Sequence, residues 1–370
     1  MRSDFIERNQ SRTVAATGVF TGVEAATLKT KRGVSPWLWS FGALLIALVA
    51  SIAIGAVPIP LSSVVRLLAS PLMQVEPDVP AAFETILYEI RLPNLVLIAL
   101  AGMALGASGT SFQGLFRNPL ADPYVIGIAA GAGLAAVLVM SARWPTDLLG
   151  MAAVPAAAFG GALLTVALVY MLARVGRSTP VTTLILAGVA VSSFATAITS
   201  TVMLLSTSEL HRAVTWMVGG FSLGGWGPVL ASLPYVVIAI STLLLLGRPL
   251  DVLQFGDEQA GQMGLNVGRV KLVIVVAASL AAATAVAFLG IIAFVGLVVP
   301  HLARLLWGTS YRRLLPLATL LGASFLLTAD IVARSVISPR VIPLGVVTSI
   351  VGAPFFIYLL ARSKRKLRAW

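Results

Sequence analysis

The strongest constraint on this chain is a series of long apolar runs that contain no charged residue. Each run is roughly 16–25 residues long, which is the length of a helix that crosses a bilayer and well beyond that of a barrel strand. In lipid, only helices and closed barrels satisfy all of their own backbone hydrogen bonds. The composition agrees, because the 370 residues are 58% hydrophobic and 11% charged, whereas soluble domains carry about 25% charged residues. The sequence therefore predicts an all-α integral membrane protein.

Ten spans are predicted, and they form one membrane domain over residues 37–362 between two basic tails, 1–36 and 363–370. The apolar stretch from Leu272 to Ala303 is too long for one ordinary span. We expect Gly290 to divide it into two helices joined by a tight turn. The predicted spans cover approximately residues 37–57, 91–112, 124–141, 149–172, 180–205, 228–246, 272–289, 291–303, 314–333 and 342–361.

The distribution of basic residues indicates the orientation. Ten spans place both termini on one side of the membrane. With the tails inside, the outer loops hold six of the 26 Lys and Arg residues, which leaves 20 inside. Cytoplasmic loops carry such an excess, so both termini are predicted to be cytoplasmic. Because the basic residues are scattered among loops and tails, the net charge of +12 does not indicate a nucleic-acid partner. The outer basic residues are Arg66, Arg91, Arg143, Arg212, Arg334 and Arg340.

A polar segment, Gly247–Lys271, interrupts the apolar second half of the chain. A membrane chain that only reverses direction needs just a few residues, yet this segment carries two helix signals in which Asp precedes the first turn and Gly follows the last. The two predicted helices are Val252–Phe255, capped by Asp251 and stopped by Gly256, and Glu258–Met263, capped by Asp257 and stopped by Gly264.

The acidic character of this segment favours docking to a partner protein. Asp257, Glu258 and Gln259 lie beside apolar residues such as Phe255 and Met263. An amphipathic helix on the lipid surface is the alternative, but such helices usually carry Lys and Arg on their polar face.

Several kinds of chemistry are disfavoured by residues that the chain lacks. It has no Cys, so disulfides and thiolate metal sites are excluded, and its two His residues leave little for a metal centre. It has no P-loop motif and no cluster of His, Asp and Glu in its sequence of the kind that an active site needs, which predicts a subunit that is not an enzyme. We interpret His301, inside an apolar run, as a buried histidine that is hydrogen-bonded to a neighbouring helix rather than as a gate or ligand.

The energy source for transport is predicted to lie on a partner. Every acid lies in a tail, a loop or a span end, whereas ion-coupled carriers place ionisable or polar groups near the midplane. A pore-forming subunit driven by a partner therefore fits better than a secondary carrier or channel that acts alone, which remains the alternative from a different class.

A series of distinctive motifs runs along almost the whole chain, from about Trp37 to Arg362. The motifs are Arg91-Leu-Pro, Gln113-Gly-Leu-Phe-Arg-Asn-Pro-Leu-Ala-Asp-Pro, Leu186-Ala-Gly, Trp216-Met-Val-Gly-Gly, Phe294-Val-Gly-Leu-Val-Val-Pro-His-Leu-Ala-Arg, Ala329-Asp-Ile-Val-Ala-Arg, Pro343-Leu-Gly-Val-Val-Thr and Gly352-Ala-Pro-Phe-Phe. In these motifs and in their order, the chain resembles the permeases of type II ABC importers for iron chelates, haem and cobalamin, the FecCD-like family, and the motifs are specific to that family.

The resemblance implies a ten-helix subunit in the bacterial inner membrane that forms a homodimer with the pathway at the subunit interface. It also implies two cytoplasmic ATP-binding cassette subunits, which carry ATP and Mg²⁺, and a periplasmic substrate-binding protein. The chain itself would hold no cofactor. An ABC exporter membrane domain is disfavoured by the ten spans.

The resemblance also assigns roles at the two membrane faces. Arg91 and Arg334 match outward-facing arginines that dock the binding protein, although Asn94 stands where the cobalamin importer has a further basic residue. The alternative for both arginines is an anchor at the membrane interface. The residues matched to the ATPase-coupling helix are Asp257, Glu258, Gln259, Met263, Gly264 and Leu265.

Two further groups are matched to the pathway. Small side chains along the fifth span would line it, and tight helix packing is the alternative for each of them. A ferric siderophore is the commonest ligand class in the family, with haem and cobalamin as alternatives, and haem would favour His211 and Arg212 as candidate contacts for its propionates. The gate residues are Pro180, Val181, Thr182 and Thr183, and the lining residues are Ser192, Ser193, Thr196, Thr199 and Met203.

Overall fold

A computed structural model describes residues 35–55, 57, 59–73, 79–142, 153–176, 179–206, 209–220 and 224–367. The predicted basic tail over residues 1–36 lies almost entirely outside these ranges. At the other end, the last helix continues to Leu367 and so extends into the predicted C-terminal tail.

The described residues contain the ten apolar helices that the sequence predicts. Seven are long and apolar enough to cross a membrane, and three more are apolar but shorter. The long ones are α2 (Pro36–Ala53), the stretch Ala81–Phe116 that ends in α5 (Leu92–Phe116), α8 (Ala153–Ala173), α9 (Val181–Leu205), α11 (Gly227–Leu245), α14 (Val267–Leu289) and α16 (Tyr311–Ser335). The shorter ones are α6 (Ile128–Ser141), α15 (Val295–Trp307) and α17 (Leu344–Leu367), whose apolar part is Leu344–Leu359.

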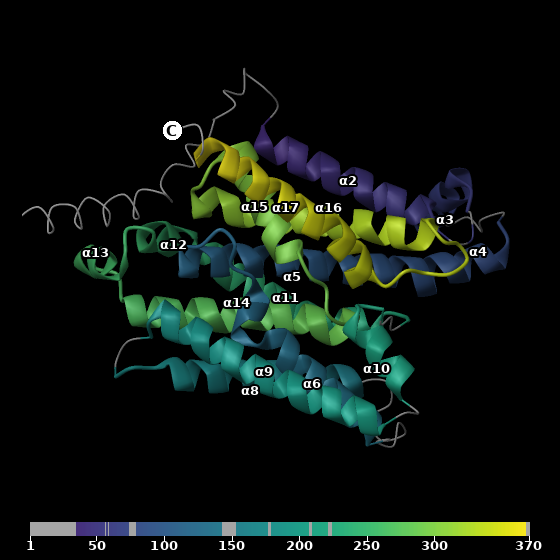
Figure 1. Ribbon diagram of the computed structural model, residues 1–370. Coiled ribbons are helices and arrows are strands. Elements are labelled where there is room, and N and C mark those ends of the chain that lie inside the picture. Colours follow the sequence, from purple (N-terminus) through teal and green to yellow (C-terminus); the bar gives the residue numbers. More distant parts are fainter. Residues whose placement is uncertain are drawn as a thin grey trace, which may run out of the picture.

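The long helices run side by side as a bundle, and short helices collect at its two ends (Figure 1). At one end lie α12 (Gly247–Leu253) and α13 (Asp257–Gln262), which belong to the polar segment. At the other end lie α3 (Leu61–Met73), α4 (Ala81–Thr85) and α10 (Leu210–Met217). The fold thus separates the polar segment from the other short helices by the length of the bundle.

The centre of the bundle is formed by α5, α14 and α16. Each of these helices contains an apolar segment of 18 residues, and the buried share of that segment is 89% in the stretch that ends in α5, 72% in α14 and 61% in α16. Helices α5 and α16 approach closely because glycines face each other: a Cβ atom added at Gly102 would lie 2.4 Å from the carbonyl oxygen of Gly322. Small residues at helix crossings allow such contact in membranes, where packing rather than water exclusion holds helices together.

The second span begins earlier than predicted. We expected it to start at Arg91, but the helix runs without a break from Ala81 through α4, a π-helical turn η1 (Ile86–Arg91) and α5. Pro93 lacks an N–H group and its ring would crowd the carbonyl four residues earlier. A π turn directly before it widens the helix there and lets it continue.

The division of the long apolar stretch at Gly290 is confirmed. Helix α14 ends at Leu289, Gly290 has φ +81°, and α15 begins at Val295. A Cβ at Gly290 would lie 2.2 Å from the carbonyl oxygen of Trp216, so both the backbone angle and the contact require glycine. The third span is also interrupted, because a 3-10 turn η2 (Pro123–Ile126) precedes α6.

Candidate functional site

The two short helices of the polar segment exist, but Asp251 does not cap the first of them. Helix α12 begins at Gly247, so Asp251 lies within it. Its carboxylate instead accepts hydrogen bonds from the first turn of α16, at Tyr311 N (2.6 Å) and Ser310 Oγ (3.0 Å). The sequence suggested a local cap because an Asp before an apolar turn usually serves the helix that follows it.

Helix α13 begins at Asp257 itself, with Gly256 in the capping position at φ +106°. The Asp257 carboxylate forms an ion pair with Lys271 of α14 rather than capping the helix. Gly264 follows α13 at φ +86°, as expected for a helix stop. The predicted helix is therefore present, but one of its acids is turned toward its own chain.

The opposite side of α13 faces away from the bundle. Ala260 is fully buried and holds the helix against the protein. Glu258 and Gln259 are exposed, Met263 is 61% exposed, and Phe255 just before the helix is 62% exposed. Gly264 is exposed and Leu265 is half-buried. The end of the bundle thus presents a surface that combines acidic and amide side chains with two large apolar ones, Phe255 and Met263.

Arg91 lies inside the protein. It is 7% exposed, and its guanidinium donates hydrogen bonds to the carbonyl oxygens of Ile52 (2.6 Å) and Val57. These carbonyls lie at and just beyond the end of α2, where helix carbonyls lack intrahelical partners. In this chain Arg91 therefore caps α2, a contact that the interpretation as a membrane-interface anchor did not anticipate.

Arg334 is more accessible than Arg91 but also has partners in its own chain. Its side chain is 20% exposed and forms an ion pair with Asp330 one turn earlier on α16 (2.5 Å). It also donates a hydrogen bond to Ser51 Oγ of α2 (2.9 Å). The two predicted docking arginines thus both contact α2, although only Arg334 keeps an accessible part.

A cavity of about 270 Å³ lies between α6, α9 and α10. Four of the five predicted lining residues border it, and Ser193 is exposed elsewhere on α9. The wall carries hydroxyl groups and two thioethers but no charged side chain. The lining residues are Tyr124, Ala129, Ala130, Gly133, Ser192, Thr196, Thr199, Ser200, Met203, Met217 and Ile291.

Tyr124 connects this cavity to the turn before α15. Its hydroxyl donates a hydrogen bond to the carbonyl oxygen of Ile292 (2.9 Å). Tyr124 N donates a hydrogen bond to Asp122 Oδ1 (2.7 Å), so the Asp122 side chain caps η2. These two hydrogen bonds hold η2 at the cavity wall.

The predicted gate residues stand at the first turn of α9. Pro180 occupies the capping position, and Val181, Thr182 and Thr183 open the helix. Thr183 Oγ1 donates a hydrogen bond to the carbonyl oxygen of Ala173 at the end of α8 (2.9 Å). This contact ties the neighbouring ends of α8 and α9.

The predicted ligand pair is not brought to the cavity. His211 and Arg212 lie on α10 and are exposed, and Arg212 is 3.9 Å from Glu209 in an ion pair. His301, on α15, packs edge-on against the ring of Phe355, with the ring centroids 6.0 Å apart. The expected packing is present, but among the described residues the buried His301 Nε2 has no hydrogen-bond partner, so that nitrogen does not form the predicted hydrogen bond to a neighbouring helix.

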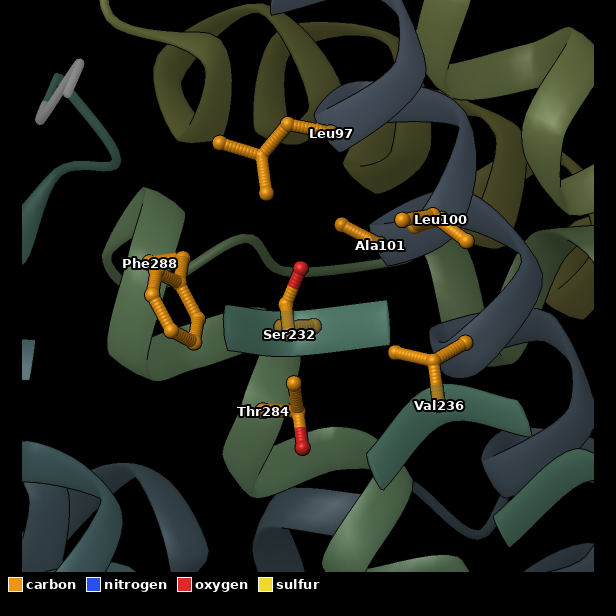
Figure 2. Close-up of a pocket in the computed structure, with 8 residues that line it drawn as sticks. Leu97, Leu100, Ala101, Ser232, Val236, Thr284 and Phe288 are labelled. Atoms are coloured by element: carbon orange, nitrogen blue, oxygen red, sulfur yellow. The ribbon is translucent and has the colours of Figure 1, made fainter. Parts of the chain in front are cut away.

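A second, much smaller space lies among α5, α11 and α14 (Figure 2). Figure 2 shows Leu97, Ser232 and Phe288 around it, and its volume is about 10 Å³. A single water needs about that much room. The space is therefore a gap in helix packing rather than a ligand site.

Sequence reasoning missed residues whose role depends on distant partners. Gln113 of α5 is 1% exposed, accepts a hydrogen bond from Arg304 Nη2 (2.9 Å) and donates one to the Gly296 carbonyl (3.3 Å). Both Gln113 and Arg304 occur in the motifs quoted above, which was the available signal. Tyr124 and Ile291 of the cavity lie outside the fifth span, where lining residues were expected.

The profile of the FecCD transport family matches residues 43–362 of this chain. The chain belongs to the FecCD transport family. It is 39% identical to the uncharacterized ABC transporter permease protein YvrB of Bacillus subtilis, over 89% of this chain and 94% of that protein. It is 41% identical to the cobalamin import system permease protein BtuC of Halobacterium salinarum, over 79% of this chain and 77% of that protein.

A solved structure of this family type has the same fold. It is described as an inward-facing conformation of a metal-chelate type ABC transporter, and it superposes with a TM-score of 0.75 at 29% identity. The match covers 88% of this chain and 98% of that one. Members of the FecCD transport family are permease subunits of importers, so the chain is a multi-pass membrane permease rather than a catalytic subunit.

Proposed function

We propose that this chain is the membrane subunit of an ATP-driven importer that moves an iron chelate, a ferric siderophore or haem, across the bacterial inner membrane by alternating access. Cobalamin is the alternative ligand, and the 41% identity to a cobalamin permease supports this alternative. The metal-chelate transporter with the same fold supports the first choice. ATP and Mg²⁺ are bound by the partner ATPases, and this chain holds no cofactor.

The outward surface of α13 is the observation that carries this proposal. Glu258, Gln259 and Met263 project from the end of the bundle, while Ala260 and the Asp257–Lys271 ion pair hold the helix in place. A short helix fixed on one side and exposed on the other fits a cleft of an ATPase subunit. The end that carries α13 is then cytoplasmic, in line with the distribution of basic residues.

The opposite end of the bundle is where a periplasmic binding protein would dock. Arg334 is the accessible docking residue, because part of its side chain reaches the surface. Arg91 contributes by holding the end of α2 beside it. Between the two ends, the cavity along α9 forms half of a pathway whose other half comes from a second copy, and the turn at Pro180–Thr183 forms its cytoplasmic gate.

Reconstitution tests the proposal. The chain is purified with its ATPase subunits, the mass of the complex is measured, and uptake into proteoliposomes is followed with binding protein and labelled ferric hydroxamate, haem or cobalamin. We expect two copies of the permease and ATP-dependent uptake of an iron chelate. Uptake driven by an ion gradient without ATP would identify a carrier that acts alone, and uptake of cobalamin only would establish the alternative ligand.

Reversing the charge of α13 tests its assignment. We expect the variant with Glu258→Lys and Gln259→Lys to lose most co-purification with the ATPase, because two cations replace an acid and an amide on a docking surface. The control is Glu84→Lys, which adds positive charge to an exposed acid at the other end of the bundle. Equal recovery of the ATPase with both variants would refute the assignment.

A further inference from the structure

One carboxylate connects the polar segment to a helix that runs the length of the bundle. Asp251 Oδ1 accepts a hydrogen bond from Tyr311 N (2.6 Å), and Oδ2 accepts from Ser310 Oγ (3.0 Å) and Arg312 N (3.4 Å). The free N–H groups and the positive end of the helix dipole make the first turn of α16 a favourable place for a negative charge. The capping position of α16 is held by Ser310, whose own side chain makes no capping hydrogen bond.

A second contact attaches the same short helix to α5. Gln254, at the end of α12, donates a hydrogen bond to the carbonyl oxygen of Gly114 (3.0 Å). Leu250 is fully buried, and a Cβ at Gly114 would lie 2.8 Å from both Leu250 and the ring of Tyr311. Helix α12 is therefore fastened to the adjoining ends of α5 and α16 through side chains on two of its turns.

Helices α5 and α16 continue this connection to the other end of the molecule. They touch through Gly102 and Gly322, without room for a methyl group. Helix α16 has 25 residues, which corresponds to about 38 Å, and its far end carries Asp330 and Arg334 beside α2. Close packing makes such a pair of helices move as one body, since packed interiors have low compressibility.

We propose that Asp251 is a positioning residue that transmits movement of the α12–α13 pair to α16. The carboxylate holds the two elements together by charge-assisted hydrogen bonds, so a shift of α13 displaces the near end of α16 and, through it, the far end with Arg334. This inference rests on the proposed function, in which α13 contacts the ATPase. It assigns the hydrogen-bonded link between α12 and the first turn of α16 to one side chain, while Gln254 separately attaches α12 to α5.

A purely structural cap is the competing explanation, and a pair of variants separates the two. Asp251→Ala removes both the cap of α16 and its link to α12. Adding Ser310→Asp to Asp251→Ala places a carboxylate in the capping position of α16 itself, where Asp is a preferred cap. The double variant thus restores the cap without restoring the link.

The measurements are thermal stability of the purified complex and the ratio of ATPase activity with loaded binding protein to activity without it. We expect Asp251→Ala to lower this ratio at least about five-fold, the lower range of coupling between distant sites. The double variant should regain thermal stability while the ratio stays low. Recovery of the ratio in the double variant, or a wild-type ratio in Asp251→Ala, would overturn the inference.

The wild-type complex separates a failure of the proposed function from a failure of the role given to Asp251. If the wild-type complex shows no stimulation by loaded binding protein, the proposed function fails and not the role of Asp251 alone. If Asp251→Ala does not assemble, the double variant decides, because its α16 helix is still capped. Normal stimulation of ATPase activity in the double variant would show that the hydrogen bonds between Asp251 and α16 transmit no movement.

Discussion

Helices α2 and α9 are equally exposed in the single chain, yet their exposed surfaces differ. In each helix, 17% of the 18-residue apolar segment is buried inside the protein. Every exposed side chain of α2 is apolar, including two Trp residues in its first turn. Helix α9 mixes exposed apolar residues such as Phe194 with exposed hydroxyl groups. The exposed hydroxyl-bearing residues of α9 are Thr182, Ser193, Thr196, Ser200 and Thr201.

Hydroxyl groups alone do not decide what a helix faces, because Ser and Thr can bond to their own backbone. Thr201 Oγ1, for instance, donates to the carbonyl oxygen of Ala197 (2.9 Å). The deciding observation for α9 is the cavity, which borders this helix at Ser192, Thr196 and Ser200. We therefore propose that the two exposed surfaces have different surroundings: lipid for α2, and water or a second subunit for α9.

An acid placed on each helix should give the largest contrast. Leu45 lies midway along α2 and is 63% exposed. Leu45→Asp should sharply reduce the amount of membrane-inserted protein, because Asp at the centre of a lipid-facing helix costs about 2.5–3.5 kcal/mol. Thr196→Asp, on the cavity wall, should leave insertion near the wild-type level. Immunoblots of the membrane fraction compare them, and equal losses would erase the distinction between the helices.

Two glycines offer a smaller, matched contrast. A Cβ at Gly42 of α2 or at Gly133 of α6 would meet nothing within 4 Å, but only Gly133 lines the cavity. Gly133→Leu should lower the initial rate of uptake several-fold by narrowing a space of about 270 Å³, with little change in thermal stability. Gly42→Leu should change neither quantity. Normal uptake in Gly133→Leu would show that the cavity is not part of the transport pathway.

Structural features that are determined by a few neighbouring residues could be predicted from the sequence. The ten apolar helices follow from run length, and the break after α14 and the stop after α13 follow from Gly290 and Gly264, both of which adopt positive φ in the structure. Each of these signals acts within one or two helical turns. The backbone satisfies them regardless of which helices lie next to one another.

Features that depend on distant partners could not be predicted. Asp251 looked like a local cap, but its partners lie about sixty residues later at the start of α16. Arg91 looked like a surface charge at a span end, but the end of α2 lies beside it and supplies two carbonyl groups. The cavity likewise combines α9 with Tyr124 and Ile291 from separate turns. Helix adjacency decides all three, and no local pattern encodes it.

The central claim is that the exposed face of α9 borders water while that of α2 borders lipid. The chain has no native Cys, so single cysteines at Thr196, Ser200, Leu45 and Val49 can be labelled with a membrane-impermeant maleimide in the assembled transporter. A thiol must ionise to react, which requires water. We expect labelling at Thr196 and Ser200 that changes when ATP is added, and none at Leu45 and Val49. Equal labelling of the two helices, or none on α9 in any nucleotide state, would contradict the claim.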